Sequence, residues 1–155
     1  ADRALVLDRG KQIFLGPDCG VGTFSSRPMN STEIAVAKLQ AMSNAACDIA
    51  EVLGAAAILV PTYSGRTASA VARHRPRRPI IAVTHKRQAV QQLALEWGVV
   101  SAEIEEAENV EHLWSRAIEA ARETGLVAAG DRIVLTAGTA VNVPGTTNVI
   151  KVETA

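Results

Sequence analysis

The residues best suited to binding an anion lie in one short segment, residues 62–67, with the sequence Thr-Tyr-Ser-Gly-Arg-Thr. Gly65 permits a left-handed backbone or a close backbone approach, and a helix start leaves N–H groups unpaired at the positive end of its dipole. The Ser and Thr hydroxyls can donate to phosphate oxygens, while Arg66 can hold a phosphate or pair with an acidic neighbour. The segment therefore fits a phosphate-binding turn, although an ordinary strand-to-helix turn with a Ser/Thr cap fits it too.

Alternating strands and helices are expected to position this segment. The strands are predicted at residues 55–60, 79–84, 99–102 and 132–137, and the helices at 66–75, 86–97 and 108–124. Apolar strands separated by helices predict an α/β fold with a parallel sheet buried on both faces and right-handed crossovers. A last strand, residues 148–152, follows a connection too short for a helical crossover, so we expect it to run antiparallel to its predecessor.

Two further elements are predicted before this pattern begins. Short apolar pieces at residues 4–7 and 13–15 indicate a hairpin, and a loop rich in Gly and Pro follows it. A long helix then ends at Gly54. Its apolar side chains recur at helical spacing, at Ile34, Ala35, Leu39, Met42, Ala46, Ile49 and Leu53. Cys47 lies beside this stripe, so we expect it to be a small core residue.

Three loops are expected to meet at the carboxyl ends of the strands, where open α/β sheets bind ligands. They are residues 62–67, 84–87 and 138–148. The third loop can fold near the first and close over a phosphorylated small molecule, although its Thr side chains can instead satisfy their own backbone in turns. The candidate phosphate-binding residues are Thr62, Ser64, Gly65, Arg66, Thr67, Gly138, Gly145, Thr146 and Thr147.

Composition excludes several classes of partner. With 16 basic and 16 acidic side chains the net charge is zero, so no overall field attracts nucleic acid or an anionic membrane. The basic run at residues 73–78 suits a helix end, although a subunit contact or the attraction of an anionic ligand also fits it. Two cysteines make no disulfide framework, and no apolar run approaches the length of about 20 residues that spans a bilayer. We therefore expect a cytoplasmic protein.

Taken together, the order and spacing of these segments resemble the C-terminal domain of pyruvate kinase over about residues 31–153. The matching segments are residues 57–60, 64–68, 71–73, 75–76, 79–84, 125–126, 130–131, 144–148 and 150–152. The resemblance implies a three-layer fold whose mixed, mainly parallel sheet of about five strands is flanked by helices. It also implies allosteric binding of a phosphorylated metabolite and oligomer contacts. We therefore expect a regulatory domain at residues 29–155, preceded by an N-terminal extension or hairpin at residues 1–28.

The resemblance leaves catalysis outside this chain, because the family's catalytic barrel is a separate domain. Magnesium and potassium would belong to that barrel, so we expect no cofactor, catalytic residue or metal ligand here. Nor does the sequence contain a Walker-type phosphate loop to replace them. Partners are expected to be the effector and either further copies of the chain or a pyruvate kinase barrel. Leu113 stands where fructose-bisphosphate-responsive members carry arginine, which favours a monophosphate as effector.

Two other functions stay open. One is an assembly module whose phosphate loop is vestigial. The other is a small metal-dependent enzyme, because residues 16–24 are similar to the segment around a zinc-ligand cysteine in relatives of cobalamin-independent methionine synthase. Cys19 has no neighbouring CxH or CxxC, so its candidate partners would be His74, His85 or His112, and a loop cysteine is the simpler interpretation. His85 is expected as an exposed loop residue on the ligand-binding edge, where contact with an anion is also open.

Overall fold

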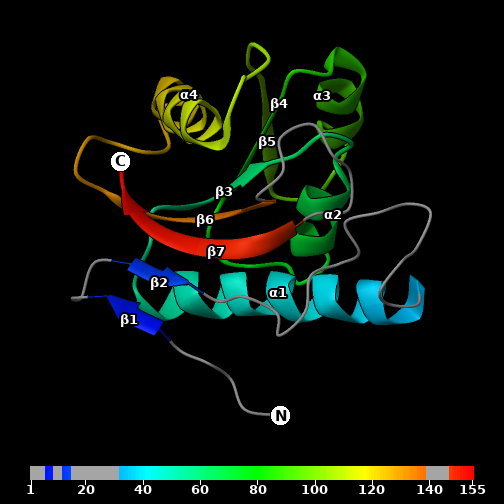
Figure 1. Ribbon diagram of the computed structural model, residues 1–155. Helices are drawn as coiled ribbons and strands as arrows, with labels where there is room; N and C mark the ends of the chain where they lie inside the picture. The colour runs from blue at the N-terminus through cyan, green and yellow to red at the C-terminus, as the bar shows by residue number, and fades with distance from the viewer. Residues whose placement is uncertain (1–5, 9–11, 15–31, 139–146) are drawn as a thin grey trace.

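A five-stranded mixed sheet organises the protein in a computed structural model that describes residues 6–8, 12–14, 32–138 and 147–155 (Figure 1). The elements are β1 Val6–Asp8, β2 Gln12–Phe14, α1 Thr32–Val52, β3 Ala57–Pro61, α2 Arg66–Ala72, β4 Ile80–Thr84, α3 Arg87–Leu93, β5 Val99–Glu103, α4 Val110–Glu123, β6 Arg132–Gly138 and β7 Thr147–Thr154. The strand order is β5-β4-β3-β6-β7. The predicted α/β class and sheet size are therefore confirmed.

Strands joined through a helix run parallel in this sheet, and the last strand, which follows a short connection, runs antiparallel. β3 lies at the centre and pairs in parallel with β4 and β6, with Ile58 opposite Ile80 and Ala57 opposite Ile133. β7 runs antiparallel to β6, as predicted, with Arg132 opposite Thr154. Because β3, β4, β5 and β6 all run the same way, their carboxyl ends lie at one edge of the sheet.

Residues of β3 alternate between two hydrophobic cores. Ile58 and Val60 face the layer of α1 and α2, whereas Ala57 and Leu59 face α4 on the opposite side (Figure 1). Fully burying a Val, Leu or Ile side chain of this kind stabilises the fold by roughly 1.5–3 kcal/mol before ordering costs are subtracted. The resulting three layers place α2 directly beside the carboxyl edge of β3.

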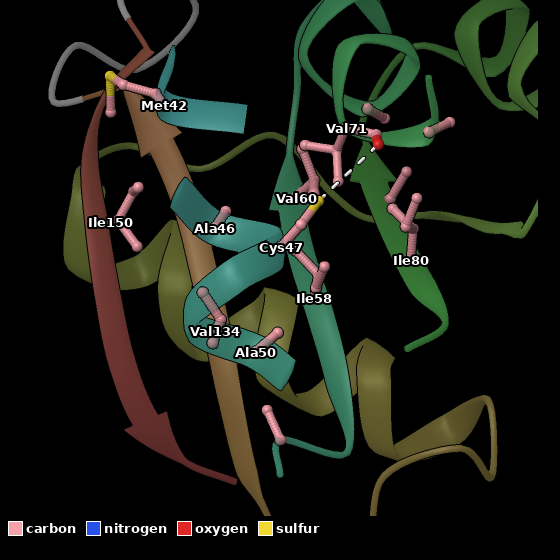
Figure 2. Packing of buried hydrophobic residues seen from close by; sticks show 14 of the residues in the cluster. Met42, Ala46, Cys47, Ala50, Ile58, Val60, Val71, Ile80, Val134 and Ile150 are labelled. Atoms are coloured by element: carbon pink, nitrogen blue, oxygen red, sulfur yellow. Dashed lines mark hydrogen bonds between the residues drawn. The ribbon is translucent and has the colours of Figure 1, made fainter. Parts of the chain in front are cut away.

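The face of α1 that meets the sheet includes Met42, Ala46 and Ile49 of the predicted stripe. Figure 2 shows Met42, Ala46, Cys47 and Ala50 of α1 pointing toward residues of β3, β6 and β7. Burial and the nearby carboxylate of Asp48 raise the pKa of the Cys47 thiol to about 11. The thiol therefore stays protonated at neutral pH, as suits the expected core residue.

Three predicted helix boundaries are wrong. α2 ends at Ala72 because the next residues form a turn, in which the His74 N–H donates to the Val71 carbonyl at 3.1 Å. Arg75 then takes a left-handed backbone, with φ of 47°. α3 likewise ends at Leu93, where the Glu96 N–H donates to the Leu93 carbonyl. α4 begins after Asn109, whose side chain accepts from the His112 N–H at 2.8 Å.

The predicted hairpin is present as β1 and β2, which pair antiparallel with Val6 opposite Phe14. β2 lies beside β7, so the hairpin accompanies that end of the main sheet (Figure 1). Among the described residues, no helix is both long and apolar enough to cross a membrane.

Candidate anion-binding site

The turn between β3 and α2 depends on glycine at position 65. Gly65 has φ of 82°, in the left-handed region that side chains disfavour. A Cβ placed there would lie 3.3 Å from the Cδ2 and Cγ atoms of Leu93, a tight contact. The Gly65 N–H donates to the Thr62 hydroxyl at 3.1 Å, which fixes the turn internally. The backbone therefore approaches α3 more closely than other residues would allow.

At the start of α2, backbone N–H groups have no acceptor among the described residues. Gly65 is its N-cap and no side chain caps the helix; the first backbone bond within it runs from the Ser69 N–H to the Gly65 carbonyl at 3.0 Å. The N–H groups of Arg66, Thr67 and Ala68 precede that bond and have no acceptor inside the helix. Such donors suit an anion or water at the carboxyl edge of the sheet.

A hydroxyl pair joins this turn to the last strand. The Oγ1 atoms of Thr67 and Thr147 lie 2.8 Å apart, although the residues are 80 positions apart in the sequence. Thr67 is buried, and Thr147 opposes Gly138 beyond an irregularity in the pairing of β6 and β7. The structure thus brings Gly138 and Thr147 of the third predicted loop to the edge where the first loop lies.

Arg66 projects from this edge without a protein partner. Its side chain is exposed at the first position of α2. Within the described part of the chain, its guanidinium makes neither an ion pair nor a hydrogen bond. Ser64 is exposed beside it in the same turn. Arg66 therefore does not pair with an acidic neighbour among the described residues, which was one of the two roles considered for it.

The loop after β4, predicted to lie at this edge, adds an aromatic and basic cluster whose contacts with Tyr63 were not predicted. The Thr84 hydroxyl donates to the Tyr63 carbonyl at 3.4 Å and accepts from the Lys86 N–H at 3.1 Å. The Tyr63 ring meets His85 edge-on, with centroids 5.3 Å apart, and the Lys86 ammonium lies 5.1 Å from the Tyr63 centroid. In the sequence, this basic cluster is indicated only by the consecutive Lys86 and Arg87 that follow an apolar strand.

His85 differs from the exposed loop residue that was expected. It is half-buried against Tyr63, and its Nε2 atom is buried with no hydrogen-bond partner among the described residues. Its place on the carboxyl edge agrees with the prediction. An exposed histidine was expected because no sequence pattern indicates that Tyr63 packs against the ring.

Several candidate residues are not placed. Gly145, Thr146 and Cys19 lie outside the described residues. His74, in the turn after α2, and His112, on α4, are both exposed. Among residues 6–8, 12–14, 32–138 and 147–155, no group of three His, Cys, Asp or Glu side chains is arranged to hold a metal ion.

The fold and this edge define an α/β domain of the class that gathers polar loops at the carboxyl ends of parallel strands. A family model described as "Pyruvate kinase, alpha/beta domain" matches residues 40–153. The chain belongs to this family.

Similarity to individual pyruvate kinases covers most of the chain and a small part of each relative. The chain is 44% identical to the pyruvate kinase of Geobacillus stearothermophilus over 101 residues, 65% of this chain and 17% of that protein. It is 42% identical to pyruvate kinase 2 of Synechocystis over 113 residues, 73% of this chain and 19% of the relative. It is 40% identical to the pyruvate kinase of Agrobacterium vitis over 123 residues, which are 79% of this chain and 26% of that protein. The chain thus spans about a quarter or less of these relatives.

Proposed function

We propose that this domain is a regulatory part of a pyruvate kinase, binding a phosphorylated metabolite at the turn of residues 62–67. Binding would use the Arg66 guanidinium, the N–H groups at the start of α2 and the hydroxyls of Thr62, Ser64 and Thr67. Gly138, Gly145, Thr146 and Thr147 would belong to the loop that closes over the ligand. The proposal also includes contacts with further copies of the chain or with a catalytic barrel.

The observation that carries the proposal is the exposed Arg66, which has neither an ion pair nor a hydrogen bond among the described residues and follows a turn held by its own hydrogen bonds. Thr62 fixes that turn on one side, and the Thr67–Thr147 hydroxyl pair ties it to β7 on the other. A preorganised donor set binds more tightly because little ordering remains to be done. Residues 62–67 and 84–87 include three cationic side chains, Arg66, Lys86 and Arg87, and no acidic residue. The local charge thus favours an anion.

A monophosphate is the proposed ligand class. The turn supplies one arginine, which suits one phosphate group, and Leu113 offers no second guanidinium on α4. Phosphoryl transfer is assigned in this proposal to a catalytic barrel outside the domain, because it requires metal ions and positioned positive charge.

A thermal-shift screen tests the binding. The probes are sugar monophosphates, fructose bisphosphate, AMP and inorganic phosphate, since a ligand of the native state raises the melting temperature by mass action. Arg66→Ala is expected to weaken binding about 10- to 100-fold, because each charge-assisted hydrogen bond contributes roughly 1.5–3 kcal/mol.

Arg132→Ala is the matched control. Arg132 is also exposed, but it begins β6 and therefore lies at the opposite edge of the sheet. A saturable shift that survives Arg132→Ala and is lost in Arg66→Ala supports the proposal. No shift with any probe, or equal affinity in the Arg66 variant, rejects it and leaves the assembly module as the alternative.

A further inference from the structure

A few buried side-chain nitrogens have no hydrogen-bond partner among the described residues. They are Arg78 Nε, His85 Nε2 and Trp114 Nε1. Of these, only His85 belongs to a loop of the candidate anion-binding site, residues 84–87. A buried polar nitrogen without a partner is costly and therefore uncommon in folded proteins. Its place beside an anion-binding turn points to a partner that is supplied from outside the chain.

The Tyr63 side chain packs against His85. The two rings meet edge-on, with centroids 5.3 Å apart and planes at 67° to each other. Tyr63 is 37% exposed, whereas His85 is half-buried and its Nε2 atom is buried. Contact with the more exposed ring therefore shields part of the His85 ring from solvent. Edge-on ring pairs add only modestly to the free energy of burial, so this contact can be exchanged for a better one.

The backbone beneath the two rings is held firmly, but the Tyr63 side chain is not. The Thr84 hydroxyl donates to the Tyr63 carbonyl at 3.4 Å and accepts from the Lys86 N–H at 3.1 Å. The Gly65 N–H donates to the Thr62 hydroxyl at 3.1 Å. The Tyr63 hydroxyl makes no hydrogen bond within the described part of the chain. Rotation of the Tyr63 side chain would therefore leave the backbone bonds of both loops intact.

Positive charge surrounds the two rings. The Lys86 ammonium lies 5.1 Å from the centroid of the Tyr63 ring, and Arg66 follows in the same turn as Tyr63. Neither cation has an ion pair among residues 32–138 and 147–155. An anion at this edge would therefore meet two cationic side chains. Once the Tyr63 ring moved, it would also meet an imidazole nitrogen that can donate a hydrogen bond.

We propose that the Tyr63 ring is a gate over His85. When a phosphate group binds at the turn of residues 62–67, the ring turns away and His85 Nε2 donates a hydrogen bond to a phosphate oxygen. Opening loses the contact between the rings, and the new bond to a charged acceptor offsets that loss. The gate makes the site selective, because only an acceptor that reaches Nε2 favours the open arrangement.

This inference rests on the proposed function, since it adds a gate and a donor to the same site. It has a consequence that an ungated turn lacks. Apparent affinity is reduced in proportion to the fraction of molecules that are open. Removal of the Tyr63 ring is therefore expected to tighten phosphate binding, whereas removal of the His85 imidazole is expected to weaken it.

The first test compares the affinity for inorganic phosphate of wild type and of variants at the two rings, from the concentration dependence of the thermal shift. Tyr63→Ala is expected to bind about threefold more tightly, and His85→Leu on the order of tenfold more weakly. In the double variant the gain from Tyr63→Ala is expected to disappear, because opening no longer provides a donor.

Two further variants control for size and charge. His85→Gln can place an amide donor near the position of Nε2, so it is expected to bind more tightly than His85→Leu. His74→Leu is the matched control, because His74 is exposed in the turn after α2, at the opposite edge of the sheet. It is expected to bind phosphate as wild type does. Circular dichroism confirms that each variant folds.

A spectroscopic test follows the gate directly. The chain contains one tyrosine, so 3-fluorotyrosine labels Tyr63 alone. In wild type, inorganic phosphate is expected to move the single fluorine resonance toward its position in urea-unfolded protein, because the ring leaves His85 for solvent. In His85→Leu, phosphate is expected to leave the resonance nearly unchanged. A purely structural role of His85 would not remove the response of the Tyr63 ring to phosphate.

The outcomes distinguish the gate from the proposed function. A wild type whose stability and fluorine resonance do not respond to phosphate overturns both. Phosphate binding that is lost in Arg66→Ala but unchanged in Tyr63→Ala and His85→Leu supports the proposed function and overturns the gate. A gain in Tyr63→Ala that persists in the double variant also overturns it. If His85→Leu fails to fold, a wild-type resonance that stays unmoved at saturating phosphate is sufficient to reject the gate.

Discussion

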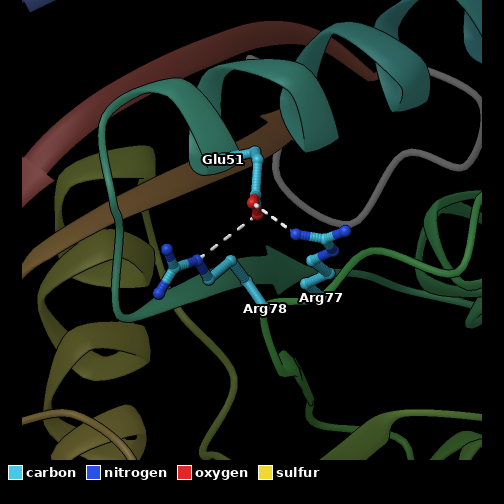
Figure 3. A network of polar contacts seen from close by, with 3 residues as sticks. All are labelled: Glu51, Arg77 and Arg78. Carbon is cyan, nitrogen blue, oxygen red and sulfur yellow. Dashed lines mark ion pairs between the residues drawn. The ribbon is translucent and has the colours of Figure 1, made fainter.

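Arginines at the two ends of the parallel strands have different surroundings. At the amino end, Glu51 of α1 lies 3.7 Å from Arg77 and 3.6 Å from Arg78, as Figure 3 shows. At the carboxyl end, Arg66 has no such neighbour among the described residues. Arg77 and Arg78 each lie close to a carboxylate of the same chain, whereas Arg66, beside the N–H groups at the start of α2, would be available to a ligand under the proposed function. Both ends of the strands carry arginine in the sequence. They differ in the structure because the Glu51 carboxylate lies beside the arginines at the amino end.

The largest effect is expected where the carboxyl-end turn is crowded. Gly65→Ala adds a side chain at φ of 82° and 3.3 Å from Leu93, so it should destabilise the fold by about 2 kcal/mol. Gly130→Ala is the control, because Gly130 has φ of 92° with nothing within 4 Å of the added Cβ. Urea denaturation of both variants separates backbone strain from crowding. Equal losses would show that the approach to Leu93 is not important.

A carboxylate introduced next to Arg66 would give it the kind of partner that Glu51 provides at the amino end of the strands. Ser64→Glu places an acid beside Arg66, as Glu51 lies beside Arg77 and Arg78. It should weaken phosphate-ligand affinity roughly 10- to 100-fold, because the guanidinium gains a competing partner and the ligand meets a like charge. Isothermal titration measures the affinity, and Ser64→Gln is the uncharged control. Unchanged affinity in Ser64→Glu would contradict binding at this turn.

The hydroxyl pair gives a smaller, non-additive effect. Thr67→Val leaves the Thr147 hydroxyl without this bond and should cost about 1–2 kcal/mol of stability. Thr147→Val should behave similarly. The double variant removes both partners, so its loss should be smaller than the sum of the single losses. A double-mutant cycle in urea measures the coupling, and strict additivity would mean that the pair contributes nothing.

The smallest effect is expected at the amino end. Glu51→Gln breaks two ion pairs whose distances exceed those of hydrogen bonds and whose Glu51 side chain is 48% exposed. Its cost should be less than about 1 kcal/mol and should shrink further in high salt. Thermal melts at low and high ionic strength measure it. A loss of several kcal/mol would show that this end is held electrostatically.

Most of the sheet was predictable because its strands are continuous apolar runs and its last connection is short. The helix ends before Gly54 and Gly125 were predicted closely, whereas α3 ends at Leu93 although Gly98 follows its predicted end. The predicted end of α2 was also wrong, because α2 leads into a turn in which Arg75 takes a left-handed backbone, a conformation that its residue type does not indicate.

The candidate site was predictable only in its local part. The turn of residues 62–67 carries its own chemistry, so Gly65 and Arg66 were identified from residue type and spacing. The Thr67–Thr147 contact depends on an irregular register between β6 and β7, and the burial of His85 depends on the position of Tyr63. Such contacts arise from tertiary packing, which single-sequence patterns do not encode.

The Thr67–Thr147 pair also has a kinetic consequence. The turn after β3 is local in sequence and can form early, but its hydroxyl partner arrives only when β7 joins the sheet, across 80 residues of chain. The complete edge is therefore expected to assemble late, after the transition state of folding. A ligand bound there would slow unfolding while leaving the folding rate nearly unchanged. The ligand-bound domain would then stay folded for longer, because each molecule would unfold more slowly.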